Sequence, residues 1–124
     1  MFPDGGIARF RLFGVVVPVF PDPSVTVDLA HVANGGLAVA VSDQHFGKAS
    51  NVLLPGRGVD MGDGWETTRS RGKGHTDWVI VKLGAPGTIE KVVIDTAHFK
   101  GNFPKLVKLE ATNSEEVCSS PCDG

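Results

Sequence analysis

Residues 55–78 read PGRGVDMGDGWETTRSRGKGHTDW, and the rest of the chain is organised around this polar, glycine-rich stretch. It holds both tryptophans. It is too rich in glycine for a helix interior, where each Gly costs about 1 kcal/mol relative to Ala. Loops longer than about 12–15 residues in compact domains are usually functional or disordered. Because disordered segments are poor in aromatic residues, the tryptophans favour an ordered loop carried on a scaffold.

The totals indicate one domain without a nucleic-acid or membrane partner. The chain has 124 residues and a formal net charge of −2. This length fits a single domain, and a charge so close to neutral argues against a general electrostatic grip on nucleic acid. The apolar run at residues 15–20 is too short to span a bilayer and is interrupted by Pro18, and the N-terminus lacks the pattern of a secretory signal.

The cysteines favour a reducing compartment. Cys118 and Cys122 both lie near the end of the chain, so no disulfide framework holds a core together. The sequence therefore predicts an intracellular protein, with the cytoplasm as the simplest location and the peroxisome left open.

Segments on both sides of the loop have the patterns of short strands. One helical turn is expected within residues 28–36, closed by Asn34-Gly35-Gly36. Several short strands without a long amphipathic helix favour an all-β antiparallel sandwich or barrel. The predicted strands cover residues 7–13, 37–42, 78–83, 88–96 and 105–112.

Three polar breaks between the strands carry side chains from which a site could be built. At one end of a sandwich, these carboxylates and imidazoles could bind a metal or act as general acids and bases. Their spacing matches no specific metal motif, and Asp in such breaks also forms turns with its own backbone. The set comprises Asp43, His45, Asp60, Asp63, Glu66, His75, Asp77, Asp95 and His98.

Basic and aromatic residues share these loops. An Arg side chain suits bidentate capture of a carboxylate or phosphate, although a solvated charged loop explains the same residues. Trp65 and Trp78 fit a packing role. The basic residues are Arg57, Arg69, Arg71, Lys73 and Lys100.

Three long motifs carry a family resemblance. DGWET at residues 63–67, HTDWVIVKLG at 75–84 and IDTAHFKGNFP at 94–104 resemble the allantoicase family. Residues 3–11, 42–46 and 51–58 agree with the same family, in the same order.

The resemblance implies two tandem repeats, each a jelly-roll β-sandwich like the galactose-binding domains. Residues 1–14 are then the closing strand of the first repeat, residues 15–30 a linker, residues 31–116 a truncated second repeat, and residues 117–124 a tail outside the family pattern. Because the closing strand of the second repeat would be missing, the sandwich is expected to be incomplete. One hypothesis is that residues 7–13 pair in the vacant position.

The resemblance also implies hydrolysis of allantoate to ureidoglycolate and urea in purine (allantoin) degradation. His98 and His75 are candidate acid–base groups, with Glu66, Asp77 and Asp95 as bases or orienting partners. Neither a cofactor nor a metal is expected. The candidate substrate-binding residues are Arg57, Arg69, Lys100, Asn102 and Trp65.

Two alternatives stand beside this interpretation. Jelly rolls of this kind also serve as non-enzymatic modules that bind small ligands, and a fold alone does not determine function. The shortened chain could also be a catalytically inactive fragment. Assembly into a homo-oligomer is left open by the sequence.

Overall fold

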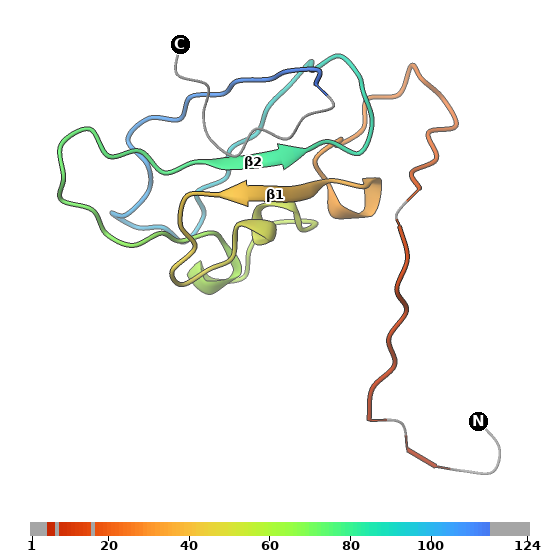
Figure 1. The fold of residues 1–124 in the computed structure, drawn as a ribbon, viewed down its shortest axis with the longest axis horizontal. Helices are drawn as coiled ribbons and strands as arrows, with labels where there is room; N and C mark the ends of the chain where they lie inside the picture. Colours follow the sequence, from red (N-terminus) through yellow and green to blue (C-terminus); the bar gives the residue numbers. More distant parts are fainter. Residues whose placement is uncertain (1–4, 7, 16, 115–124) are drawn as a thin grey trace.

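A two-stranded antiparallel sheet lies at the centre of the molecule (Figure 1). The computed structural model describes residues 5–6, 8–15 and 17–114. Strand β1 (Leu37–Val41) pairs with β2 (Val79–Lys82), and the register shifts between Ala38 and Ala40. The other elements are short 3-10 helices, and loops make up the rest of the described chain: η1 (Val32–Asn34), η2 (Ala49–Leu53) and η3 (Met61–Asp63).

Both strands and the predicted turn follow from their sequences. The β-branched run of β2 and the alternating Ala and Val of β1 favour extended backbone, so strands predicted at residues 37–42 and 78–83 are confirmed. The turn predicted within residues 28–36 is η1. Its N-cap is His31, and it ends at Gly35, whose φ of 91° is a left-handed conformation that glycine adopts without strain.

The core is small. Helix η2 packs against β1, and its residues Ala49 and Leu53 are the buried hydrophobic residues of the described chain. Many large apolar side chains remain exposed, among them Val93 at 72% and Leu106 at 85%. Among the described residues, no helix is long and apolar enough to cross a bilayer.

Three predicted strands are wrong for this structure. Residues 88–96, 105–112 and the described part of 7–13 form no strand. Their alternation fits a strand, but a strand persists only where a neighbouring segment completes its hydrogen-bond ladder. The few helices and the antiparallel sheet are nevertheless consistent with a mostly β protein.

The N-terminal segment leaves the body of the molecule (Figure 1). Residues 8–13 form no ladder with β1 or β2, so the hypothesised pairing within one chain does not occur in this structure. The proposed tail at residues 117–124 lies outside the described residues.

Candidate functional site

Two loops that are distant in the sequence meet through Arg57 and Asp95. The guanidinium donates from Nε to Asp95 Oδ2 at 2.9 Å and from Nη2 to Oδ1 at 3.3 Å. The hydrogen bond from Arg57 holds the pKa of the Asp95 carboxyl below its ordinary value, and the N–H of Ala97 lowers it further. In turn, the hydrogen bond to Asp95 raises the pKa of Arg57. The pair is solvent-accessible, with the Arg57 side chain 75% exposed.

His98 joins the same two loops. Its Nε2 lies 2.9 Å from the carbonyl oxygen of Gly58. A carbonyl only accepts hydrogen bonds, so Nε2 carries the proton and Nδ1 of the neutral ring is left with a lone pair. His98 also has a φ of 71°, the one left-handed conformation among the described non-glycine residues. Such backbone strain is often found at functional sites.

Glu66 and Asn102 face each other across the same two loops. Asn102 Nδ2 lies 3.5 Å from Glu66 Oε1 and 3.3 Å from Met61 Sδ. The Phe99 ring packs so closely on Gly64 that a Cβ there would lie 2.8 Å from ring carbons. Glycine at position 64 therefore permits the close approach of the two loops.

Asp77 anchors a second group of polar side chains. Its Oδ2 accepts from Thr67 Oγ1 at 2.8 Å and lies 3.1 Å from His75 Nε2, while Oδ1 accepts from Ser42 Oγ at 2.9 Å. Burial raises the pKa of the Asp77 carboxyl, but hydrogen bonds from Thr67, Ser42 and His75 outweigh burial, and the pKa lies below its ordinary value. Two predicted site residues, His75 and Asp77, are thus in direct contact.

Asp43 is a structural residue that is absent from the predicted catalytic and substrate-binding sets. Its backbone carbonyl accepts from Trp65 Nε1 at 2.8 Å, and its carboxylate accepts from the N–H of Thr68. That N–H lowers the pKa of the Asp43 carboxyl. The indole N–H of Trp65 is therefore used in a hydrogen bond to the backbone. Asp43 contacts Trp65 and Thr68, which lie on either side of Glu66 in the sequence. The sequence signal for this role is its position directly after a predicted strand.

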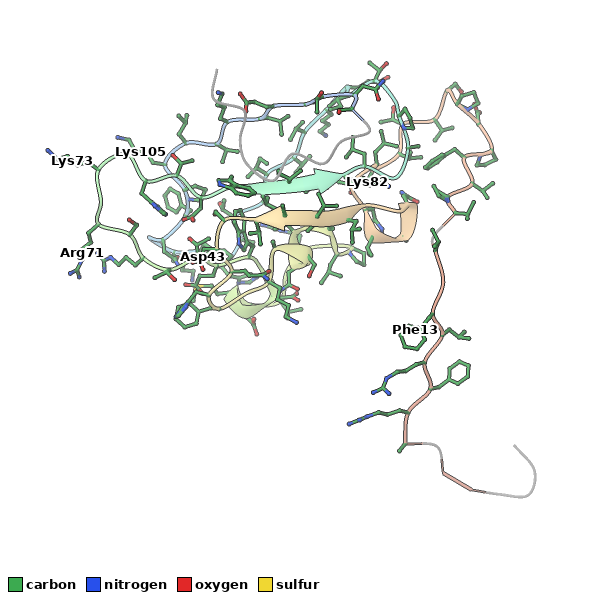
Figure 2. All side chains as sticks on the ribbon, viewed as in Figure 1. Phe13, Asp43, Arg71, Lys73, Lys82 and Lys105 are labelled. Atoms are coloured by element: carbon green, nitrogen blue, oxygen red, sulfur yellow. The ribbon has the colours of Figure 1, made fainter. Side chains whose placement is uncertain are left out.

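Two predicted substrate-binding residues are not brought into the site. The side chains of Arg69 and Lys100 are exposed and form no hydrogen bond or ion pair within the described part of the chain. Figure 2 shows Arg71 and Lys73 at the outer end of the loop that contains Arg69, away from the sheet. The structure thus separates the basic residues into Arg57, which is held by a carboxylate, and others that face solvent.

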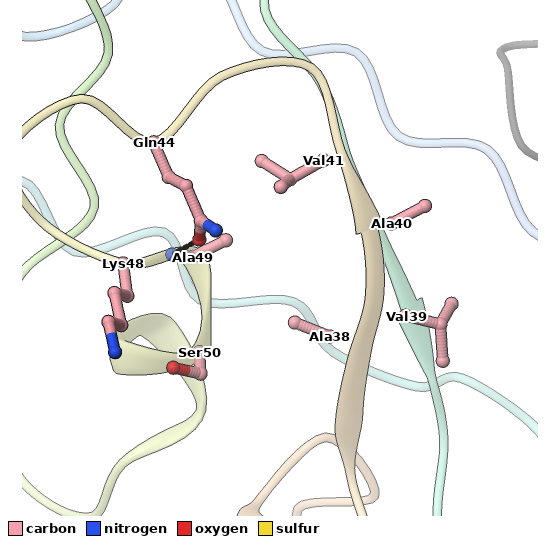
Figure 3. A pocket seen from close by; sticks show the side chains of 8 residues that line it. All are labelled: Ala38, Val39, Ala40, Val41, Gln44, Lys48, Ala49 and Ser50. Carbon is pink, nitrogen blue, oxygen red and sulfur yellow. Dashed lines mark hydrogen bonds between the residues drawn. The ribbon is translucent and has the colours of Figure 1, made fainter.

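The site is an exposed loop surface. A cavity of about 320 Å³ lies along β1 and η2 (Figure 3), and another of about 390 Å³ lies at the start of β1; neither is lined by a predicted catalytic residue. Across residues 5–6, 8–15 and 17–114, no group of three or more His, Cys, Asp or Glu is placed to hold a metal ion. What the loops offer is imidazole, carboxylate and guanidinium chemistry.

Two antiparallel strands, with adjoining loops that carry imidazole, carboxylate and guanidinium groups, define the class of the chain as a mostly β protein. The family model described as the allantoicase repeat matches residues 27–123. The chain belongs to the allantoicase family. It is 67% identical over 122 residues to a probable allantoicase of Schizosaccharomyces pombe, and 65% identical over 112 residues to the allantoicase of Neurospora crassa.

Solved structures agree with this assignment. A structure of allantoicase matches with a TM-score of 0.68 and 62% identity, covering 84% of this chain and 31% of that one. The crystal structure of the Saccharomyces cerevisiae allantoicase matches with a TM-score of 0.54 and 62% identity, covering 68% of this chain and 25% of the other.

The chain spans about a third of the length of its curated relatives. It aligns over 98% of its own residues but 36% of the S. pombe protein, and over 90% of its residues but 32% of the N. crassa protein. What those longer proteins do is therefore a proposal for this chain.

Proposed function

We propose that this chain supplies one loop face of an allantoicase site, which hydrolyses allantoate to ureidoglycolate and urea in purine degradation. The observation that carries the proposal is the meeting of two family motifs. Residues 57–66 and 95–102 are joined by the Arg57–Asp95 pair, the His98–Gly58 hydrogen bond and the Glu66–Asn102 contact. Allantoicase relatives that are 55–67% identical support the substrate class.

The reaction sets three chemical requirements. Allantoate has a carboxylate and two ureido groups on one carbon. One C–N bond at that carbon breaks, and the leaving nitrogen takes a proton and departs as urea. Water adds its hydroxyl to the same carbon, which gives ureidoglycolate. The site therefore needs an acid, a base and a cation for the carboxylate.

His98 suits the acid–base role. Because the Gly58 carbonyl binds Nε2–H, Nδ1 of the neutral ring is available to accept a proton from water and later to return one to the leaving nitrogen. Glu66 lies on the facing loop, where its carboxylate can orient the water. His75, held by Asp77, provides the alternative acid–base group.

Arg57 suits the carboxylate-binding role. Its guanidinium has five N–H donors, and Asp95 takes one on Nε and one on Nη2. The remaining donors lie on Nη1 and Nη2, and together they match the two oxygens of a carboxylate. Asn102 adds an amide beside Glu66.

The proposal includes the architecture that the family resemblance implies. In a longer protein, residues 31–116 would belong to a jelly-roll repeat, with residues 1–14 closing the preceding repeat and residues 15–30 linking the two. The small core of Ala49 and Leu53 supports this view, because so little buried surface leaves the loops dependent on added structure.

The exposure of the site favours a second candidate, a chain that is inactive by itself. The site is exposed and no predicted catalytic residue lines either of the two cavities. An active site that works on a small molecule usually excludes water around it.

The test is a urea-release assay with allantoate, on this chain beside the longer S. pombe relative. Release by this chain, abolished by His98→Asn, supports the proposal in its strongest form. Release by the relative that is abolished by the matching substitution, with none from this chain, supports the loop assignment and the inactive-alone candidate. Full activity of the substituted relative removes His98 from the mechanism. Binding of allantoate without turnover by either protein supports a ligand-binding module instead.

A further inference from the structure

Residues 8–13 form an extended segment, here called the N-terminal arm, that leaves the body of the molecule (Figure 1). Arg9 and Arg11 alternate along it with Phe10 and Leu12. Phe10 is 78% exposed and Leu12 is 84% exposed. Alternating residues of a strand point to opposite faces, so the arm has the pattern of a half-buried strand without a neighbour to bury it.

Strand β1 has an open edge. One edge pairs with β2, and the cavity of about 320 Å³ lies between β1 and η2, on the side of the strand to which Ala38 and Val41 point (Figure 3). Four consecutive strand residues, Ala38 to Val41, line this cavity together with Gln44 and residues 48–50. Within the described residues, no backbone hydrogen bond joins Leu37–Val41 to any segment other than β2. Such an edge is a template for another strand.

We propose that the arm of one copy adds as a strand to the β1 edge of a second copy, so that two chains exchange arms. Main-chain hydrogen bonds supply the pairing. Phe10 and Leu12 enter the cavity, where the small side chain of Ala38 leaves room for larger ones (Figure 3). The arm of the same chain runs away from its own β1 edge, which favours the exchange between copies (Figure 1).

Charge favours the same partner. The arm carries Arg9 and Arg11 and no carboxylate. The remaining 10 of the 12 basic side chains are set against 14 acidic ones, so the rest of the chain is net negative. The one charged residue that lines the cavity is Lys48, so the attraction acts between the positive arm and the overall negative charge of the body, and it weakens as salt is added.

The first test is light scattering across a concentration series. The chain should pass from 13.1 kDa to twice that mass as its concentration rises. Leu12→Asp should lower the association constant at least about 10-fold, because it removes a buried leucine. Leu106→Asp is the matched control: Leu106 is 85% exposed against 84% for Leu12, and its substitution should leave association unchanged.

The second test uses a synthetic peptide of residues 5–14. It should bind the Leu12→Asp variant, whose β1 edge is free, and should convert the wild-type dimer to monomer. A peptide with the same Leu12→Asp change should do neither. A wild-type chain that stays monomeric, a dimer that survives Leu12→Asp, or a monomer whose arm amides are protected from hydrogen exchange overturns the proposal. The result does not depend on whether allantoate is hydrolysed.

Discussion

His98 combines a left-handed backbone with a hydrogen bond that sets the position of its ring proton. The two features separate a conformational role from a chemical one. Asparagine tolerates the left-handed conformation but has no imidazole. Substitutions at this single position can therefore distinguish a residue that shapes the loop from a residue that transfers protons.

In the longer S. pombe relative, we expect the substitution matching His98→Asn to lower kcat/KM for urea release about 100-fold or more, as for loss of a general acid–base group. The melting temperature should stay close to that of the wild type, because Asn adopts the same backbone. The substitution matching His45→Asn in the same relative is the control, since His45 of this chain is exposed and contacts Phe46. Equal losses from both substitutions would contradict a specific role for His98.

Asp95 provides a pH-dependent contact between the loops. Its pKa is lowered in the folded state by the hydrogen bond from Arg57, so the ionised carboxylate stabilises the folded chain. This contribution is fully present above the unfolded pKa, near 3.9, and is lost as pH falls through the lower folded value.

We expect Arg57→Gln to raise the pKa of Asp95 toward its ordinary value, measured by NMR titration of the carboxyl carbon. The matched control is Arg69→Gln, because Arg69 has no ion-pair partner among the described residues. If the two variants give the same Asp95 titration, the Arg57 contact does not set this pKa.

At the scale of elements, Asp77 ties the ends of both strands to the long loop. Ser42 follows β1, and its hydroxyl both donates to Asp77 and accepts from the N–H of Trp78, the residue before β2. Thr67 and His75 connect the loop to the same carboxylate. One side chain therefore links three segments.

We expect Asp77→Asn to lower the free energy of unfolding by about 1–2 kcal/mol, because an amide offers one acceptor atom where the carboxylate offers two. Guanidinium chloride denaturation followed by tryptophan fluorescence measures the change. Asp60→Asn is the control, since Asp60 precedes η3 without a side-chain cap hydrogen bond. An unchanged midpoint for Asp77→Asn would show that the link does not stabilise the fold.

The elements also show how far sequence patterns reach. Residues 37–42 and 78–83 were predictable as strands because each finds the other as a partner. Residues 88–96 and 105–112 have the same pattern but no ladder here, and no local pattern reports whether a partner exists. At the site, Arg57 and Asp95 were both candidates, yet their pairing spans 38 residues and only the fold reveals it.

For the whole molecule, the balance of buried and exposed apolar surface is unusual. Monomeric soluble proteins rarely leave large continuous apolar patches uncovered. Here, exposed apolar residues concentrate in residues 10–15, 17–19, 89–94 and 103–109, and the chain spans about a third of the length of its curated relatives. The proposed jelly-roll repeat would bury part of this surface within a longer protein.

Leu109 tests this proposal because one substitution has different expected effects in two proteins. In this chain Leu109 is 60% exposed, so Leu109→Ala should change the free energy of unfolding by less than about 0.5 kcal/mol. In the longer S. pombe relative, the alternation of residues 105–112 would place the matching position inside the proposed sandwich. The same substitution should then cost about 2–5 kcal/mol, as for other buried leucines.

Lys108→Ala is the control in both proteins, because alternation places it on the opposite face. Its contact with Glu110, at 2.7 Å, is a surface ion pair, and its loss should cost less than about 1 kcal/mol. A small effect of the leucine substitution in both proteins would contradict the jelly-roll assignment. A large effect of Leu109→Ala in this chain but not in the relative would show that residues 105–112 are already packed here. Removing an exposed side chain leaves no cavity and should have little effect.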